Sequence, residues 1–314
     1  MEFRHLRCFL AVAEELHFAR AAERLHIEQS PLSRTIKELE EDLGEQLFVR
    51  TSRSTRLTPA GKLFLEHVPR VFTALQQARD SVKAAAKGFH SQLRIALSDG
   101  IAPARLPALL ALCRQEEPDV EIRLFEVPLS QQIKGLHSDL YDVGFGQADE
   151  VGDGLVAEAA WTDPLMVAVP ARHPLLTHKR IPLNEVLRYP LVLCDPQVCE
   201  GHARQIDRVL RRAEQEPVIA ERVTSSDLMM ALVSAGFALG LTGAAQIASS
   251  REAGVVARPL AGRSPILTTY LLRREGEISE VLARFIERVQ AIESPEGLRH
   301  APSSQSYNPQ DIKQ

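Results

Sequence analysis

Polar and basic side chains recur at helical spacing in a short stretch that begins at Gln29. A helix starting there carries one stripe of hydrogen-bond donors with two cations, at positions i, i+3, i+4 and i+7: Ser30, Ser33, Arg34 and Lys37. Pro31 is compatible with this helix because it falls in the first turn. Such a helix can lie in the major groove of DNA and contact base edges with its first turns.

The side chains of this stripe suit different atoms of DNA. Arg34 can donate two hydrogen bonds to one guanine, and Gln29 can pair with adenine. Lys37 lies a turn further along the helix, where an ammonium group suits a phosphate. We therefore expect a DNA-reading surface made of Gln29, Ser30, Pro31, Ser33, Arg34 and Lys37.

A second basic cluster follows at residues 49–56. It contains no acidic residue, and serines and threonines separate its three arginines, Arg50, Arg53 and Arg56. Cations interleaved with hydroxyl groups suit a wing that touches phosphates or a minor groove. The alternative is the solvated polar face of a structural bundle, which the acidic stretch 38–45 would also fit. The acidic residues lie beyond the first turns of the helix that would contact bases, and the basic residues form two separate elements. The pattern therefore favours DNA binding.

Polar segments also follow four predicted strands in the region after residue 90, and ligands of open α/β sheets bind at such strand ends. Helix N-termini in these segments would present N–H groups suited to a carboxylate, so we expect an organic acid as ligand. The candidate residues are Ser98, Asp99, Gly100, Ile101, Leu129, Ser130, Cys199, Gly201, His202 and Thr224. Ordinary capping or turn formation is the alternative for each of them, and Asp99 would repel a dicarboxylate unless it acts as a cap.

Three short helices are predicted to position the DNA-reading surface. Apolar periodicity indicates helices over 3–15, 18–25 and from Gln29 to Leu43, with Gly44 as the C-terminal cap. The third helix would bury Leu32, Ile36 and Leu39. Two short extended segments around the basic cluster complete a winged helix-turn-helix domain over residues 1–58.

A long helix is predicted over residues 59–90, with Thr58 as N-cap and Pro59 at its first position. Its apolar residues alternate at steps of four and three, which is typical of a dimerising seam: Phe64, Val68, Val71, Leu75, Ala78 and Val82. The alternative is an amphipathic helix that packs on its own domain.

Strands and helices alternate over residues 91–293, a pattern that predicts parallel βαβ units. Two crossings, at 161–164 and 262–265, divide this region into lobe I (91–162 and 266–293) and lobe II (163–265). We therefore expect a hinged α/β clamshell with the ligand in its cleft. Residues 294–314 are rich in Ser, Pro, Gln and Asn, so we expect a disordered tail.

Composition limits the other function classes. The 314 residues carry a net charge of −4, so nucleic-acid binding has to come from a local patch. The absence of a signal-like start or a long apolar run predicts a cytoplasmic protein and disfavours a solute receptor. The sequence contains no Gly-rich phosphate loop, nucleophile elbow or metal cluster, so we expect neither enzymatic activity nor a cofactor. An effector-independent DNA-binding protein stays open as an alternative.

The N-terminal 61 residues resemble the LysR-type transcriptional regulators. The resemblance rests on the segments 3–14, 18–25, 29–40, 43–44, 47–50 and 57–61, and it extends less tightly to residue 293. It implies a dimer through the linker helix, a periplasmic-binding-protein-like (type 2) effector domain and a tetramer of two dimers. It also implies promoter DNA and RNA polymerase as partners, and aromatic-degradation intermediates as effectors. The family commonly has Ser or Thr before Gln29, whereas this chain has Glu28, so the resemblance implies the fold but not the fine base preference.

The four cysteines are too few and too scattered for a disulfide scaffold. Some members of the family sense peroxide through a more widely spaced cysteine pair in lobe II, so a redox switch at Cys194 and Cys199 is a further alternative. Cys194 follows an apolar strand, where cysteine commonly serves as a small hydrophobe. His202 lies near Cys199, but no further ligand spacing indicates a metal site.

Overall fold

The computed structural model describes residues 1–50, 54–98, 105–213, 215–250 and 252–293. The chain folds as two compact units, one ending at Asp80 and the other starting at Ser81. The predictions for Arg53, Asp99, Gly100, Ile101 and the tail 294–314 lie outside the described residues. Within the described ranges, no helix is both long and apolar enough to cross a membrane.

The first unit is a winged helix-turn-helix, as predicted. Its elements are α1 (Phe3–Glu15), α2 (Phe18–Leu25), α3 (Gln29–Leu43), β1 (Phe48–Arg50), β2 (Thr55–Leu57) and the start of α4 (Pro59–Ala85). Helix α3 ends where Gly44 adopts a φ of +73°, a left-handed conformation that glycine allows without strain. Thr58 caps α4, because its Oγ1 accepts a 2.9 Å hydrogen bond from the Gly61 N–H.

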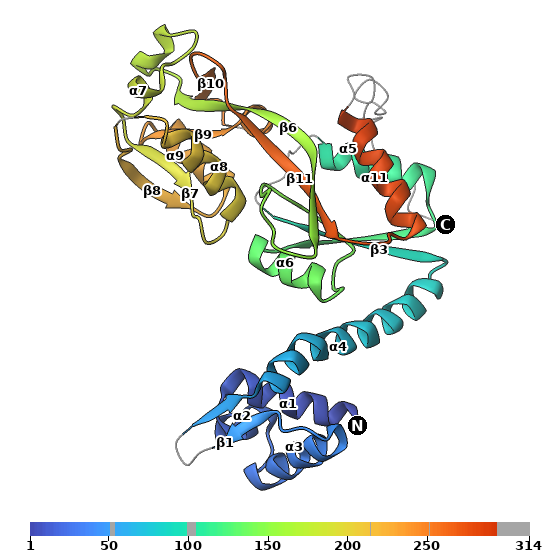
Figure 1. The fold of residues 1–314 in the computed structure, drawn as a ribbon. Helices are drawn as coiled ribbons and strands as arrows, with labels where there is room; N and C mark the ends of the chain where they lie inside the picture. Colours follow the sequence, from blue (N-terminus) through green and yellow to red (C-terminus); the bar gives the residue numbers. More distant parts are fainter. Residues whose placement is uncertain (51–53, 99–104, 214, 251, 294–314) are drawn as a thin grey trace, which may run out of the picture. The chain divides into compact units, whose positions relative to one another are not determined.

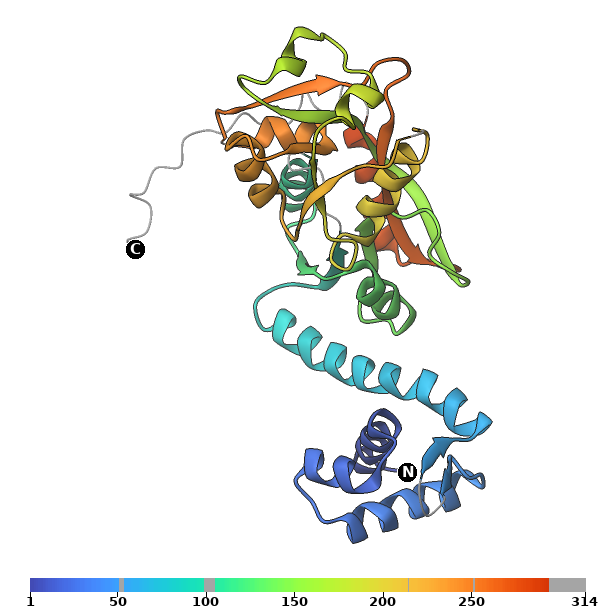
Figure 2. The same cartoon turned by 90° about the vertical axis from the view of Figure 1, so that its left-hand side faces the viewer.

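Helix α4 is one continuous helix (Figure 2) whose apolar seam serves two purposes. Its first turns pack on α1 and the wing: Val68 is buried in the core of the first unit, and the Phe64 ring lies 4.9 Å from that of Phe9. The prediction that Phe64 and Val68 contact a partner helix is therefore corrected, because their own domain covers them. The rest of the seam is more open, with Val71 42% and Val82 71% exposed.

The second unit is built on a twisted mixed sheet in two parts. In lobe I the strand order is β4-β3-β5-β11-β6, and in lobe II β6 continues into β9-β7-β8, with β10 paired to β6. The strands are β3 (Ser91–Leu97), β4 (Val120–Glu126), β5 (Val143–Gly146), β6 (Leu155–Pro170), β7 (Leu191–Cys194), β8 (Ile219–Val223), β9 (Leu239–Gly243), β10 (Val255–Pro259) and β11 (Ile266–Arg274). The pairs β3–β4, β3–β5, β7–β8 and β7–β9 are parallel, which confirms the predicted βαβ organisation.

Helices cover both parts of the sheet. They are α5 (Arg105–Glu116), α6 (Leu129–His137), α7 (Leu183–Val186), α8 (Glu200–Leu210), α9 (Ser226–Ser234), α10 (Ala244–Ser249) and α11 (Glu280–Glu293), with a 3-10 turn η1 (Pro174–Thr177). Helices α5 and α11 lie side by side in lobe I (Figure 1). The core beneath them includes Phe145 stacked on Trp161, with ring centroids 4.7 Å apart, so the closing helix completes lobe I.

The chain crosses between the lobes in two strands, the first at the predicted residues 161–164 and the second just after the predicted residues 262–265. Strands β6 and β11 run antiparallel through both lobes (Figure 1), and Asp163 lies opposite Leu267 where they cross. The pairing of these two strands with each other was not predicted from the sequence. A continuous two-stranded ribbon therefore joins the lobes.

Candidate nucleic-acid interface and effector cavity

The rotation of α3 about its axis is fixed by three apolar side chains. Leu32, Ile36 and Leu39 are fully buried against α1, α2 and the wing. The opposite side of the helix is exposed and carries Gln29, Ser30, Pro31, Arg34 and Lys37, whereas Ser33 is half-buried. The structure thus brings the predicted reading residues together on one accessible face.

The two cations on this face have different surroundings. Lys37 Nζ lies 3.4 Å from a carboxylate oxygen of Glu41, one turn further along α3. Arg34 has no ion-pair partner among the residues that the structure describes, so its guanidinium can be offered to a ligand. At the start of the helix Glu28 makes no capping hydrogen bond, as expected for a glutamate at this position.

The wing is tied to α3 through Arg50 and Glu40. An oxygen of the Glu40 carboxylate accepts hydrogen bonds from the N–H groups of Leu47 and Phe48, and the other oxygen lies 3.0 Å from Arg50 Nη2. The Arg50 guanidinium also lies over the Phe18 ring, 4.6 Å from its centroid. These contacts offset the charge of Arg50 and give it a structural role that the sequence did not reveal. Arg56, which pairs with Val49 across the hairpin, is exposed.

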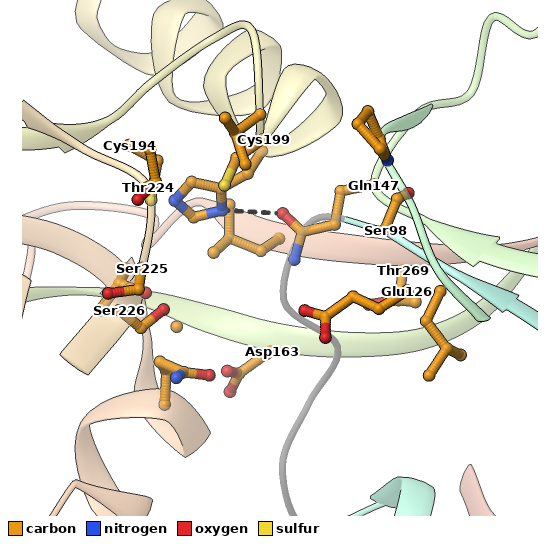
Figure 3. Close-up of a pocket in the computed structure, with 18 of the residues that line it drawn as sticks. Ser98, Glu126, Gln147, Asp163, Cys194, Cys199, Thr224, Ser225, Ser226 and Thr269 are labelled. Carbon is orange, nitrogen blue, oxygen red and sulfur yellow. Dashed lines mark hydrogen bonds between the residues drawn. The ribbon is translucent and has the colours of Figure 1, made fainter. Parts of the chain in front are cut away.

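A cavity of about 590 Å³ lies between the two lobes of the second unit. Four predicted ligand contacts line it: Ser98, Cys199, His202 and Thr224. Figure 3 labels Ser98, Cys199 and Thr224 among the lining residues. Other lining residues were not predicted from the sequence, among them Glu126, Gln147, Asp163, Thr242 and Thr269. Several of these lie on or beside β6, β9 and β11, where the two strands of the ribbon cross between the lobes. Predicting that β6 and β11 pair would have identified these residues as part of the cavity.

Three predicted contacts do not line the cavity. Leu129 is fully buried in the core of lobe I, because the first residue of α6 turns its side chain towards the sheet. Ser130 lies beside α8, where its N–H donates a 3.2 Å hydrogen bond to Glu200, and Gly201 is buried within α8. The prediction of Leu129 as a ligand contact is corrected: Val127 and Pro128 line the cavity in its place.

Ser98 reaches the cavity but uses its hydroxyl to hold lobe I together. Its Oγ lies 2.8 Å from Gln132 Oε1 and donates to it. Gln132 is fully buried, and its amide nitrogen donates to the carbonyl oxygens of Ala96 and Phe145. These bonds connect α6 to β3 and β5, so this edge of the cavity is rigid.

Helix α8 of lobe II is fastened to lobe I by direct polar contacts. The ring Nδ1 of His202 lies 2.9 Å from Gln147 Oε1. Gln205 donates to the carbonyl oxygens of Gln147 and Thr268 and accepts from the Thr268 N–H. Arg208 makes two hydrogen bonds to the carboxylate of Asp149, at 3.0 and 2.9 Å, and thereby lowers the pKa of that carboxyl. Helix α8 therefore connects lobe II to lobe I through side-chain hydrogen bonds and an ion pair.

Asp163 marks the opposite wall of the cavity, at the crossing of the ribbon. Its carboxylate accepts a 3.0 Å hydrogen bond from the Ala245 N–H. Burial raises the pKa of Asp163, against the lowering effects of that N–H and of the Arg105 charge. A β-carbon on Gly243 would lie 2.1 Å from the Asp163 carboxylate, so glycine is required here to make room for it.

The polar groups of the cavity come from both lobes. Within the described ranges, no group of three or more His, Cys, Asp or Glu side chains could hold a metal ion. The cavity instead offers hydroxyl, amide and carboxylate groups from both lobes, so a ligand can contact both at once.

Comparison with known proteins agrees with both units. Residues 3–62 match the bacterial regulatory helix-turn-helix protein, lysR family, and residues 86–292 match the LysR substrate binding domain. The uncharacterized HTH-type transcriptional regulator YnfL of Escherichia coli K12 is 36% identical over 242 residues, which are 77% of this chain and 82% of that protein. BenM, a transcriptional regulator of Acinetobacter baylyi, is 30% identical over 305 residues, with 96% of this chain and 100% of BenM covered.

Solved structures show the same architecture. The crystal structure of CbnR, a LysR family transcriptional regulator, superposes with a TM-score of 0.65 at 28% identity, covering 94% of this chain and 100% of CbnR. CbnR complexed with its target DNA gives a TM-score of 0.64 at 29% identity, covering 92% and 99% of the two chains. The relatives are transcriptional regulators rather than enzymes, which confirms the expectation from the sequence that this chain is a regulator rather than an enzyme. With a DNA-binding domain and an effector-binding domain of the same type and order, the chain belongs to the LysR family of transcriptional regulators.

Proposed function

We propose that this regulator binds a dyad-symmetric promoter site and changes its DNA binding when a small molecule enters the cavity between its lobes. The observation that carries the proposal is the cavity itself, about 590 Å³ in volume and lined from both lobes, on a chain that also carries the exposed face of α3. A ligand that contacts both lobes can bias their relative arrangement only through contacts that differ between arrangements. The cavity meets this condition because its walls come from both sides of the ribbon.

Direct base contacts are assigned to the first turns of α3. Arg34 and Gln29 reach base edges in the major groove, and Lys37 contacts a phosphate. Arg56, which is exposed on β2, is assigned to the neighbouring phosphate backbone. The crystal structure of CbnR with its target DNA supports a DNA partner for a chain of this architecture.

Two copies of the chain are assigned to each DNA site, paired through the exposed apolar residues of the α4 seam. Val82 is 71% exposed, and Val71, Leu75 and Ala78 lie on the same seam of the helix. Apolar side chains at these steps are stabilised by a partner helix, because a lone helix would leave them in water. Two dimers can then form a tetramer, and RNA polymerase is a further partner of the promoter complex.

A redox switch at Cys194 and Cys199 stays the second candidate, because both side chains line the same cavity (Figure 3). It makes a different prediction from ligand binding. Replacing both cysteines by serine would abolish a response to peroxide, whereas it would leave a response to a small-molecule ligand in place.

Selection of binding sites from random DNA by the full chain tests the proposal. We expect enrichment of a dyad-symmetric sequence whose half-sites lie about one helical turn, or a multiple of it, apart. Enrichment of a single unpaired half-site would contradict the paired arrangement. No enrichment at all would contradict sequence-specific binding.

A further inference from the structure

The charge of the cavity lining differs from that expected for an organic acid. Three carboxylates line the cavity, those of Glu126, Asp163 and Asp227, whereas no Lys or Arg is among the described lining residues. The basic residue among them is His202, whose Nδ1 already faces the amide oxygen of Gln147.

These carboxylates are available to a ligand rather than committed to protein cations. Within the part of the chain that the structure describes, neither Glu126 nor Asp227 has an ion-pair partner. Figure 3 shows the carboxylates of Glu126 and Asp163 both pointing into the cavity. Arg105 is the cation whose charge acts on Asp163, but it is not a lining residue, and its Nη2 donates to the Thr162 carbonyl.

The helix N-termini that would attract a ligand carboxylate already have acidic neighbours from the protein. Asp163 accepts from the first turn of α10, and Asp227 lies in the first turn of α9, where Ser225 Oγ accepts the Leu228 N–H. Glu200 lies in the first turn of α8 and accepts from the Ser130 N–H. A second anion at any of these ends would face a protein carboxylate, so the positive ends of the helix dipoles are already compensated.

Resting on the proposed function, we infer that the cavity takes a small organic cation, a molecule with a protonated nitrogen, rather than an organic acid. The nitrogen would donate hydrogen bonds to the carboxylates of Glu126 and Asp163, and the hydroxyl groups of the lining would contact the rest of the molecule. Charge-assisted hydrogen bonds of this kind are stronger than neutral ones and would fix the orientation of the ligand. The sequence-based expectation of an organic acid is replaced by this inference.

Pairs of small molecules that match in size and differ in charge test the inference on the full chain. We would measure thermal stability and calorimetric affinity with benzylamine against benzoate, phenethylamine against phenylacetate, and cadaverine against glutarate, at equal ionic strength. We expect at least one amine to raise the melting temperature in a concentration-dependent way while its carboxylate counterpart does not. Glu126→Gln and Asp163→Asn should each lower the affinity for that amine about 10-fold or more, because each removes one charge-assisted hydrogen bond.

Glu216→Gln is the matched control, because Glu216 is exposed and lies outside the cavity lining. It removes the same charge as Glu126→Gln and should leave amine affinity unchanged. Binding of a carboxylate in preference to its amine would overturn the inference while leaving a ligand-responsive regulator in place. Equal effects of Glu126→Gln and Glu216→Gln, or no binding by any amine, would overturn it as well. Site selection on random DNA, which needs no ligand, reports separately on the proposed function.

Discussion

Replacement of Arg34 by alanine separates base recognition from general attraction to DNA. The side chain is exposed on the first turns of α3 and has no ion-pair partner among the described residues, so its removal should change the free energy of unfolding by less than about 0.5 kcal/mol. On the selected site, the loss of a bidentate contact to guanine should cost about 1–3 kcal/mol per copy. Two copies on a dyad site double the loss, so affinity should fall at least roughly 30-fold.

Lys37→Ala is the matched comparison on the same face. Lys37 already lies 3.4 Å from Glu41, and we assign it to a phosphate, which carries no sequence information. Its removal should weaken binding to the selected site and to scrambled DNA by similar factors. It should also reduce the slope of log affinity against log salt by about one per copy.

Fluorescence anisotropy with labelled duplexes, at several salt concentrations, measures both variants. Arg34→Ala should lose affinity mainly for the selected site, so that the ratio of specific to random binding falls. An equal loss on both duplexes would show that Arg34 contacts phosphate. Unchanged affinity on both would refute the assignment of α3 as the reading helix.

Three further changes test the effector domain and the dimer. Burial raises the pKa of Asp163, so ionisation of this carboxyl destabilises the folded state as pH rises through that pKa. Asp163→Asn should therefore have a higher melting temperature than the wild type at pH 7. The difference in melting temperature should shrink as pH falls towards the unfolded pKa near 3.8. Gln205→Ala should lower the melting temperature of the effector domain, because it removes three bonds to lobe I and costs about 1–3 kcal/mol for the buried groups left unpaired. Val82→Glu should shift the full chain from dimer towards monomer in sedimentation experiments, whereas the neighbouring Lys83→Glu should not; an unchanged mass for Val82→Glu would contradict the assigned seam.

The N-terminal unit followed from the sequence nearly residue by residue. Its helices are short and strongly periodic, and their ends are marked by residues with local reasons to end a helix, such as Gly44, or to begin one, such as Thr58. Local signals of this kind do not depend on the rest of the chain. The seam of α4 was less certain, because the same periodicity describes a helix that packs on its own domain. The structure assigns Phe64 and Val68 to that role.

The effector cavity was predicted in position but only partly in composition. Strand β6 was missed because Thr162, Asp163 and Pro164 interrupt its apolar pattern, and proline inside a run argues against a strand. Tertiary pairing with β11 overrides that local signal. Leu129 was misplaced because spacing alone does not say which way the first residue of a helix points. The carboxylates of Glu126 and Asp163 come together only through the fold, so their joint charge was not visible in the sequence.

The central claim is that occupation of the cavity alters DNA binding by the same chain. The most direct measurement is a footprint of the full chain on its selected site, titrated with a compound that raises the melting temperature of the protein. We predict that a saturating concentration changes the affinity or the extent of the protected region, and that the DNA changes the affinity for the compound by the same factor. A bound compound that leaves both the footprint and the affinity unchanged would contradict the account and favour an effector-independent DNA-binding protein.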